Sequence, residues 1–392
     1  MDSVKKRTFC VEILLFIFLT VCLVPPALRA AEAPSSESKS LSREELEGRV
    51  ARLEEDLARL EADREAEASR DDDGDLPENP FRKIKWSGYF TFGYRNSSEP
   101  GVASTFDMED VALIARSQVT RDFNFFSEFE FEHGTEIVAG GTSTGELKLE
   151  QAYVDWVHSD ALNVRVGKFL MPMGIWHQNF WPPLQATVFS PLVYSSKILP
   201  HTQAGVQLYG AVFPEFGEVR YAGFVSNGEG TNPFQQDLNE GKAVGGRLSL
   251  TTRYLLLGAG WYHDRVAASG GSVPFDNHLG ILYGTVRIPQ RLELSAEDLL
   301  DLDAGGRSIS GYVQALENLD RPGRYQLVQR ADHIGDYLPA SFFTADRNQW
   351  RYTFGGRIKI SDGIRLKADY VIVDRTGLPD YHIGAASFTL IF

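Results

Sequence analysis

The stretch that decides the fold is WRYTFGGRIKISDGIRLKADYVIV, Trp350 to Val373, in which apolar and charged residues alternate. Up to Tyr370, the aromatic and aliphatic residues of both halves fall at even positions, while arginine and lysine, together with Thr353 and Asp369, fall at odd positions. An alternation of period two places the two kinds of side chain on opposite faces of a strand. The stretch therefore predicts two strands, each with one dry and one wet face, joined by the short turn Ser361–Gly363.

The same alternation recurs in about sixteen segments between residues 84 and 392. Connections after even-numbered segments are short, whereas those after odd-numbered segments tend to be longer, with an exception near Ala304. The longest connection runs from Pro172 to about Gln203. A soluble sandwich or solenoid need not sort its loops in this way, but a membrane barrel has short periplasmic turns and long extracellular loops. We therefore expect an all-β fold, a transmembrane antiparallel β-barrel of about 16 strands over residues 84–392.

The N-terminal thirty residues have the pattern of an export signal. A basic stretch at residues 5–7 precedes an apolar run, Ile13 to Val24, and small residues follow up to Ala30. This order predicts a signal peptide over residues 1–30, and an uncleaved anchor is the alternative. Both cysteines, Cys10 and Cys22, lie inside this segment, so the mature chain would contain no thiol for a disulfide, a metal or catalysis.

A short helical segment is expected between the signal peptide and the barrel. Its apolar residues are spaced 4-3-4-3, which is the seam of a heptad repeat: Leu46, Val50, Leu53, Leu57 and Leu60. We assign a linker to residues 31–40, a periplasmic α-helical coiled coil to residues 41–69 and an acidic linker to residues 70–83. A lone solvated helix is the alternative, because so few heptads make a weak coiled coil.

The chain stops on AASFTLIF, Ala385 to Phe392, inside an apparent strand. In a closed barrel the last strand pairs with the first, because a bare strand edge is not tolerated in hydrocarbon. The alternating residues Phe388, Leu390 and Phe392 resemble the C-terminal signal by which the barrel assembly machinery recognises outer-membrane proteins. We expect them to serve that purpose here.

The segment EQAYVDWVHSDALNVRVGKFLMPMGIW, Glu150 to Trp176, resembles the phosphate-selective porin O/P family. Members of that family have a similar tyrosine- and aspartate-containing strand, a tight turn and a second strand resembling VGKF followed by Pro and Gly. The resemblance implies a sixteen-stranded trimeric porin in the outer membrane, often with an N-terminal periplasmic coiled coil. It indicates the family more strongly than it indicates phosphate as the solute.

The long connection after the fifth segment is the candidate constriction of the pore. From Pro172 to Ala204 it contains no Asp or Glu, although the chain has 53 acidic residues. A cation-selective pore would be expected to place carboxylates there. The candidate constriction residues are Trp176, His177, Trp181, Lys197 and His201. The alternative is that this loop only packs against the wall or against another subunit.

Lumen-facing positions follow from the alternation. The expected pore-lining, anion-contacting residues are Arg116, Arg165, Arg220, Arg247, Arg351, Arg357, Lys359, Arg365 and Lys367. The expected acidic residues opposing them are Glu128, Glu130, Glu132, Glu146 and Glu150. Guanidinium groups form planar forks that suit phosphate and carboxylate, so these residues favour small anionic solutes.

These observations predict a water-filled diffusion channel in the outer membrane, with outer-membrane lipids, a homotrimer, the assembly machinery and small anionic solutes as partners. No catalytic or phosphate-binding motif and no metal-ligand spacing is found, so no enzyme, cofactor or metal is expected. A net charge of −14 without a basic cluster argues against nucleic acid. A substrate-specific carbohydrate channel and a barrel that tethers the envelope are the alternatives.

Overall fold

The computed structural model describes residues 84–136, 144–196, 198–228, 241–266, 275–303, 306–335 and 348–392. The expected signal peptide, both linkers, the heptad seam Leu46–Leu60 and Lys197 lie outside the described residues. Within them, no helix is long and apolar enough to cross a membrane.

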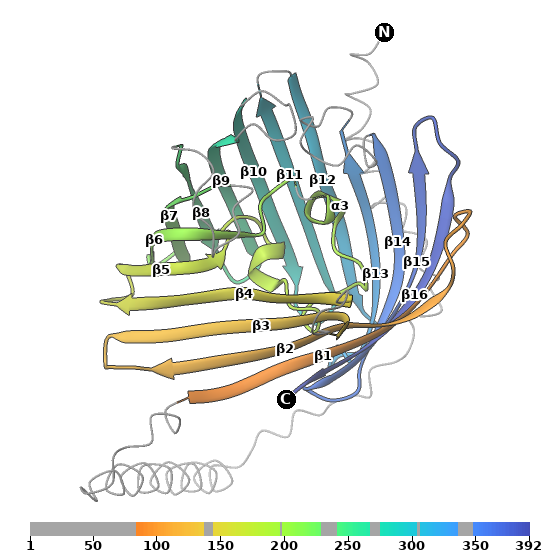
Figure 1. Ribbon diagram of the computed structural model, residues 1–392, viewed down its shortest axis with the longest axis horizontal. Helices are drawn as coiled ribbons and strands as arrows, with labels where there is room; N and C mark the ends of the chain where they lie inside the picture. The colour runs from red at the N-terminus through yellow and green to blue at the C-terminus, as the bar shows by residue number, and fades with distance from the viewer. Residues whose placement is uncertain are drawn as a thin grey trace, which may run out of the picture. The chain divides into compact units, whose positions relative to one another are not determined.

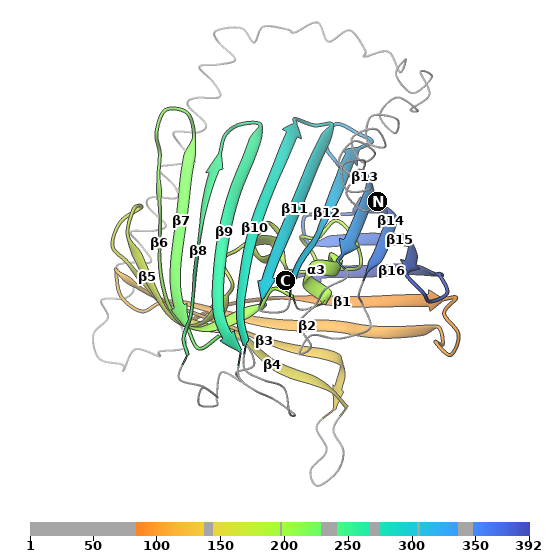
Figure 2. The same cartoon turned by 90° about the horizontal axis from the view of Figure 1, so that it is seen from above.

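Sixteen antiparallel strands follow one another around a closed barrel, and the first strand pairs with the last (Figures 1 and 2). The strands are β1 Ile84–Ser97, β2 Thr105–Gln118, β3 Phe123–Glu136, β4 Thr144–Val157, β5 Asn163–Leu170, β6 Thr202–Val212, β7 Glu218–Ser226, β8 Ala243–Thr251, β9 Leu255–Val266, β10 Phe275–Ile288, β11 Leu292–Asp303, β12 Gly306–Asn318, β13 Tyr325–Ile334, β14 Gln349–Lys359, β15 Ile364–Arg375 and β16 Tyr381–Ile391.

This topology confirms the predicted barrel and its strand number. Short turns join β2 to β3, β4 to β5 and each later even-numbered strand to its successor. Most of the longer connections follow odd-numbered strands; the connections from β11 to β12 and from β15 to β16, residues 304–305 and 376–380, are as short as the turns after even-numbered strands. The alternation in sequence therefore located the strands because each wall residue faces either the lumen or the outside.

The barrel closes where β1 meets the C-terminal strand. Gly88 donates its N–H to the carbonyl of Phe392 over 2.8 Å, and Phe392 returns a bond to the Gly88 carbonyl over 3.0 Å. A Cβ on Gly88 would lie 2.3 Å from the Ala112 carbonyl oxygen and 2.7 Å from the Phe392 ring. Glycine therefore lets the terminal residue approach the wall closely. Phe388 pairs with Phe92 in the same seam.

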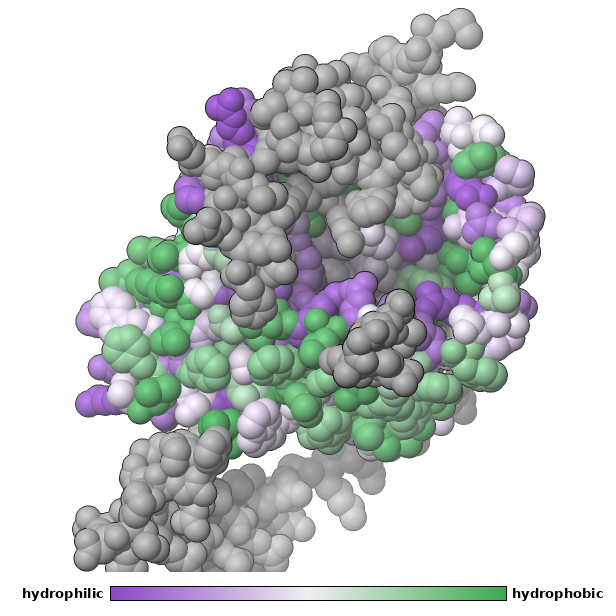
Figure 3. All heavy atoms as spheres, viewed as in Figure 1, coloured by the Kyte–Doolittle hydropathy of each residue, from purple (hydrophilic) through white to green (hydrophobic). Residues whose placement is uncertain are grey.

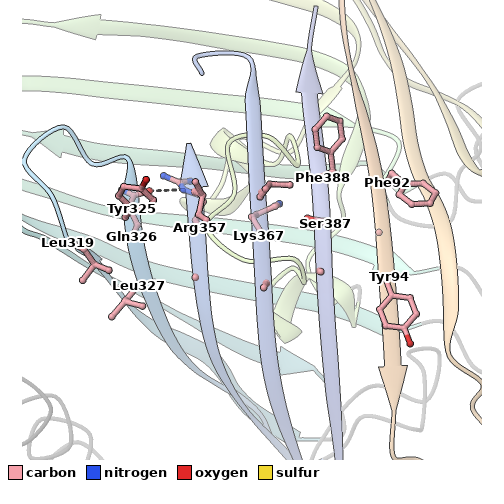
Figure 4. A pocket seen from close by; sticks show the side chains of 16 residues that line it. Phe92, Tyr94, Leu319, Tyr325, Gln326, Leu327, Arg357, Lys367, Ser387 and Phe388 are labelled. Atoms are coloured by element: carbon pink, nitrogen blue, oxygen red, sulfur yellow. Dashed lines mark hydrogen bonds between the residues drawn. The ribbon is translucent and has the colours of Figure 1, made fainter. Parts of the chain in front are cut away.

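The outside of the wall is apolar. Figure 3 shows hydrophobic side chains over the outside of the lower strands and hydrophilic side chains around the hollow above them. A shallow groove of about 600 Å³ crosses the outer face from β13 to β1, and its rims include Leu327, Phe388 and Phe92 (Figure 4). Its floor follows from register, because Gly356, Ala368 and Ala386 are direct neighbours on β14, β15 and β16. A row of small residues thus thins the wall there.

Candidate functional site: the lumen constriction

The described residues of the connection from β5 to β6, 171–196 and 198–201, fold inside the barrel (Figures 1 and 2). It contains the 3-10 turn η3 (Trp176–Asn179) and the short helix α3 (Leu192–Ser195). Its apolar side chains pack on inward residues of the wall. The loop contributes Met171, Met173, Leu192, Val193, Tyr194, Ile198 and Leu199. The wall contributes, among others, Tyr262, Leu279, Ile281 and Leu299, all at most 2% exposed. The inside of this sector is therefore a packed core rather than a wet surface.

Glu297, on the lumen side of β11, binds the beginning of the loop. Its carboxylate accepts the N–H of Ile175 over 2.9 Å and that of Trp176 over 3.1 Å. It also accepts the hydroxyls of Tyr194, over 2.7 Å, and of Tyr312. The side chain is buried, and four donors satisfy a charge that would otherwise be costly to bury.

Two further wall carboxylates bind the end of the loop. Asp332 on β13 accepts the Leu192 N–H over 3.0 Å, and Asp369 on β15 accepts the Val188 N–H over 2.6 Å. Asp332 also pairs with two buried guanidinium groups, those of Arg330 at 3.0 Å and Arg351 at 3.3 Å. The constricting loop supplies no carboxylate, and the wall supplies them instead.

The basic side chains of β13–β15 bind the carbonyl groups of the loop. Arg330 donates to the Phe189 carbonyl over 2.9 Å, and Arg351 donates to that of Ser190. Lys367 donates to two carbonyls, at 3.0 and 3.2 Å, and Arg357 to that of Gln185 over 3.4 Å. Arg365 donates to the Pro183 carbonyl. The structure thus brings Arg351, Arg357, Arg365 and Lys367 together at the loop.

The other predicted cations lie away from this cluster. Arg220 pairs with Glu218 at 2.7 Å on β7, and Lys359 pairs with Asp362 at 2.8 Å beside the turn before β15. Arg247 is partly buried on the inner side of β8. Their contact with anions stays a prediction.

The predicted acidic residues gather on the lumen side of β3 and β4. Glu130 accepts the Tyr89 hydroxyl, Glu128 accepts the Gln151 amide over 2.7 Å, and both carboxylates are buried. Lys148 bridges Glu132 at 2.5 Å and Glu146 at 2.9 Å. Glu150 lies 2.8 Å from the ring of His201.

Arg116 on β2 and Arg165 on β5 flank these acidic strands, so positive and negative side chains are interleaved in this sector. Arg165 is held by Asp155 through two bonds of 2.8 and 2.9 Å. Arg116 bonds to the Ser87 hydroxyl over 2.9 Å and is exposed to the lumen. The acidic residues therefore do not form a separate half of the pore.

The aromatic and histidine residues of the loop pack against one another. Trp176 stacks on Tyr194, and the rings of His177 and His201 lie 5.2 Å apart. His177 is 2% exposed, and its Nδ1 lies 3.2 Å from the Met173 carbonyl. Burial, and to a lesser extent the nearby His201, lowers the pKa of His177 well below the usual value for histidine. Trp181 reaches the opposite side of the lumen, 6.4 Å from the Tyr89 ring.

Sequence reasoning missed the carboxylates that bind the loop, Glu297, Asp332 and Asp369, together with Arg330. All four occupy inward positions of their strands. The alternation marks them as inward residues, but it does not show that a loop distant in sequence reaches them.

Within the described ranges, no group of three or more His, Cys, Asp or Glu side chains is arranged to hold a metal ion. What the site offers is a loop without carboxylates, fixed to the charged inner wall of the barrel by hydrogen bonds.

A closed wall that is apolar outside and charged inside, with its longest loop folded into the lumen, is the architecture of a porin, an outer-membrane diffusion channel. The chain matches the phosphate-selective porin O and P family over residues 91–178. This match confirms the resemblance seen at Glu150–Trp176.

Three comparisons extend this result. An uncharacterized protein of Aquifex aeolicus (strain VF5) is 27% identical over 357 residues, which cover 79% of this chain and 80% of that protein. The anion-selective porin from Comamonas acidovorans has the same fold, with a TM-score of 0.57 and 13% identity over 79% of this chain and 99% of that one. The trimer form of OmpT, an outer membrane protein of Vibrio cholerae, has a TM-score of 0.50 and 9% identity, with 79% and 99% coverage.

Proposed function

We propose that this porin passes small anions in preference to cations. The observation that carries this proposal is the way in which three lumen cations are held. Arg357, Arg365 and Lys367 donate to uncharged carbonyl groups of the loop, and within the described residues no salt bridge at 4 Å or less neutralises them. Carbonyl oxygens fix the positions of these side chains without cancelling their charge. The wall at the loop is therefore positive, and the loop itself contains no acidic residue.

The test is the reversal potential of the purified channel in asymmetric KCl. We expect a chloride preference that falls in the double variant Arg357→Gln, Arg365→Gln. Arg287→Gln is the matched control, because Arg287 pairs with Glu293 at 2.9 Å and lies outside the loop contacts. A strong potassium preference of the unmodified channel would contradict the proposal.

We infer that the anion is a phosphate-like or carboxylate group. Guanidinium forks on the wall fit both chemistries, and the family resemblance points to the first. Currents carried by phosphate and by acetate, measured under the same gradient, would show which of the two anion classes the channel prefers. Equal exclusion of both ions would contradict this assignment.

Export and assembly complete the proposal. Residues 1–30 direct export, Phe388, Leu390 and Phe392 are recognised by the assembly machinery, and residues 41–69 form a periplasmic coiled coil. The trimer form of a fold neighbour supports a homotrimer.

The mass of the detergent-solubilised protein, measured in solution, tests whether it is a trimer. Deletion of residues 31–83 tests the coiled coil: unchanged conductance with a weakened envelope would indicate a tethering role for that segment.

A further inference from the structure

Six side chains form a continuous series of rings and guanidinium groups along the lumen side of β2–β6. The series runs from the loop to the wall in the order Trp181, Arg116, Phe126, Tyr153, Arg165 and Tyr209. The guanidinium carbon of Arg116 lies 5.6 Å from the Trp181 ring and 5.2 Å from the Phe126 ring. Phe126 stacks on Tyr153, with ring centroids 5.0 Å apart and planes inclined by 11°. Arg165 lies 3.7 Å above Tyr153 and 5.3 Å from Tyr209.

Strand register fixes the middle of this series. Arg116 is the direct partner of Phe126 across β2 and β3, and Phe126 is the direct partner of Tyr153 across β3 and β4. Side chains opposite one another in antiparallel strands lie within contact distance. The middle of the series, from Arg116 to Tyr153, is therefore built into the wall, whereas Trp181 belongs to the loop.

The two cations of the series differ in charge balance. Arg165 is neutralised by its two bonds to Asp155. Within the described residues, Arg116 donates to the Ser87 hydroxyl and forms no ion pair, and its side chain is exposed. The neighbouring carboxylates Glu128 and Glu130 are 0% and 5% exposed. A solute in the lumen thus meets the positive charge of Arg116 before it meets these negative charges.

We propose that Arg116 and the adjacent ring faces form a subsite for solutes that carry an anionic group on a flat ring, such as aromatic carboxylates. This inference rests on the proposed anion preference and specifies the solute. The carboxylate binds the free edge of the Arg116 guanidinium, and the ring of the solute stacks on Trp181 or Phe126. An inorganic or aliphatic anion makes the first contact only. Stacking adds roughly 1 kcal/mol per ring pair, which corresponds to about fivefold in affinity.

The experiment compares block of the chloride current by benzoate with block by cyclohexanecarboxylate. The two anions have similar size and the same charge, but only benzoate is flat and aromatic. We expect benzoate to block at about fivefold lower concentration. Phe126→Leu and Trp181→Leu should each reduce this ratio toward one, whereas Arg116→Gln should weaken block by both anions. Arg287→Gln, on β10 outside the series and paired with Glu293, is the control that should change neither.

Equal block by the two anions in the unmodified channel would overturn the subsite. Loss of the ratio in Arg287→Gln would also overturn it, because that residue lies outside the series. The chloride preference in KCl alone is read in the same recordings. Its presence without a benzoate effect would leave the proposed function standing and reject only the subsite, whereas its absence would reject the proposed function itself.

Discussion

At the scale of single residues, Glu297 holds the beginning of the constricting loop. It binds two N–H groups and two hydroxyl groups of residues from separate parts of the chain. Removing the carboxylate leaves these buried, uncharged donors without an acceptor, which costs roughly 1–3 kcal/mol for each donor that finds no other partner.

We expect Glu297→Ala to release the beginning of the loop and to raise single-channel conductance while increasing its noise. Glu293→Ala, on the same face of β11 but paired with Arg287, is the matched control. Planar-bilayer recordings of both variants test this prediction. Identical conductance in Glu297→Ala and in the unmodified channel would show that other contacts hold the loop.

His177 should make the loop sensitive to acid. Because burial lowers the pKa of His177 well below the usual 6.5, the packed loop keeps this ring neutral. When the loop is released, the ring takes up a proton at any pH below about 6.5. The packed loop therefore loses stability as the pH falls from about 6.5 toward the lowered pKa, and loses nothing further below it. Conductance recorded between pH 7 and 5 should change in the unmodified channel and change less in His177→Phe. Equal pH profiles would exclude this residue as the sensor.

At the scale of elements, the sequence predicted the strands well because a barrel wall has only two sides. Arg351, Arg357 and Lys367 all face the lumen as their alternation predicted. The prediction was incomplete on β10, where Leu279 and Ile281 face inward although the lumen was expected to be wet. Alternation could not show this, because the partner of these residues is a loop distant in sequence.

Strand β11 has the reverse exception, a charged residue on its otherwise apolar outward face. Asp298 is exposed and lies between the outward residues Ala296 and Leu300, next to Leu282 of β10. The described part of the chain offers it no hydrogen bond or ion pair. A carboxylate that faces hydrocarbon costs free energy, although less than arginine or lysine at the same depth.

We therefore expect Asp298→Leu to raise the melting temperature of the detergent-solubilised barrel, with about 1 kcal/mol as the scale of the gain. Leu282→Ala, on the neighbouring outward position, is a control for packing alone and should have little effect. Circular dichroism during heating measures both. A lower melting temperature, accompanied by loss of a larger assembly, would instead show that Asp298 contacts a neighbouring subunit.

At the scale of the whole molecule, the constriction and the barrel stabilise each other. The loop fills the apolar inside of β9–β12, and the wall supplies the carboxylates and guanidinium groups that the loop lacks. The sequence showed that the loop contains no acidic residue, but it did not show which wall residues supply the carboxylates that bind the loop. That compensation explains how a loop with so little helix stays in one place inside a wide barrel.

The two ends of the barrel are joined by nine register pairs between β1 and β16, and Gly88 lets the terminal residue Phe392 bond at the end of this seam. A side chain at this position would meet the Ala112 carbonyl, which is part of the sheet and cannot move aside, and also the terminal ring of Phe392. We expect Gly88→Val to lower the fraction of protein that runs as a folded, heat-modifiable barrel in semi-native electrophoresis. Gly280→Val is the matched control, because a Cβ at Gly280 on β10 meets no atom within 4 Å. If both variants close equally well, the seam between β1 and β16 tolerates displacement, and closure relies on the remaining backbone pairs between these two strands.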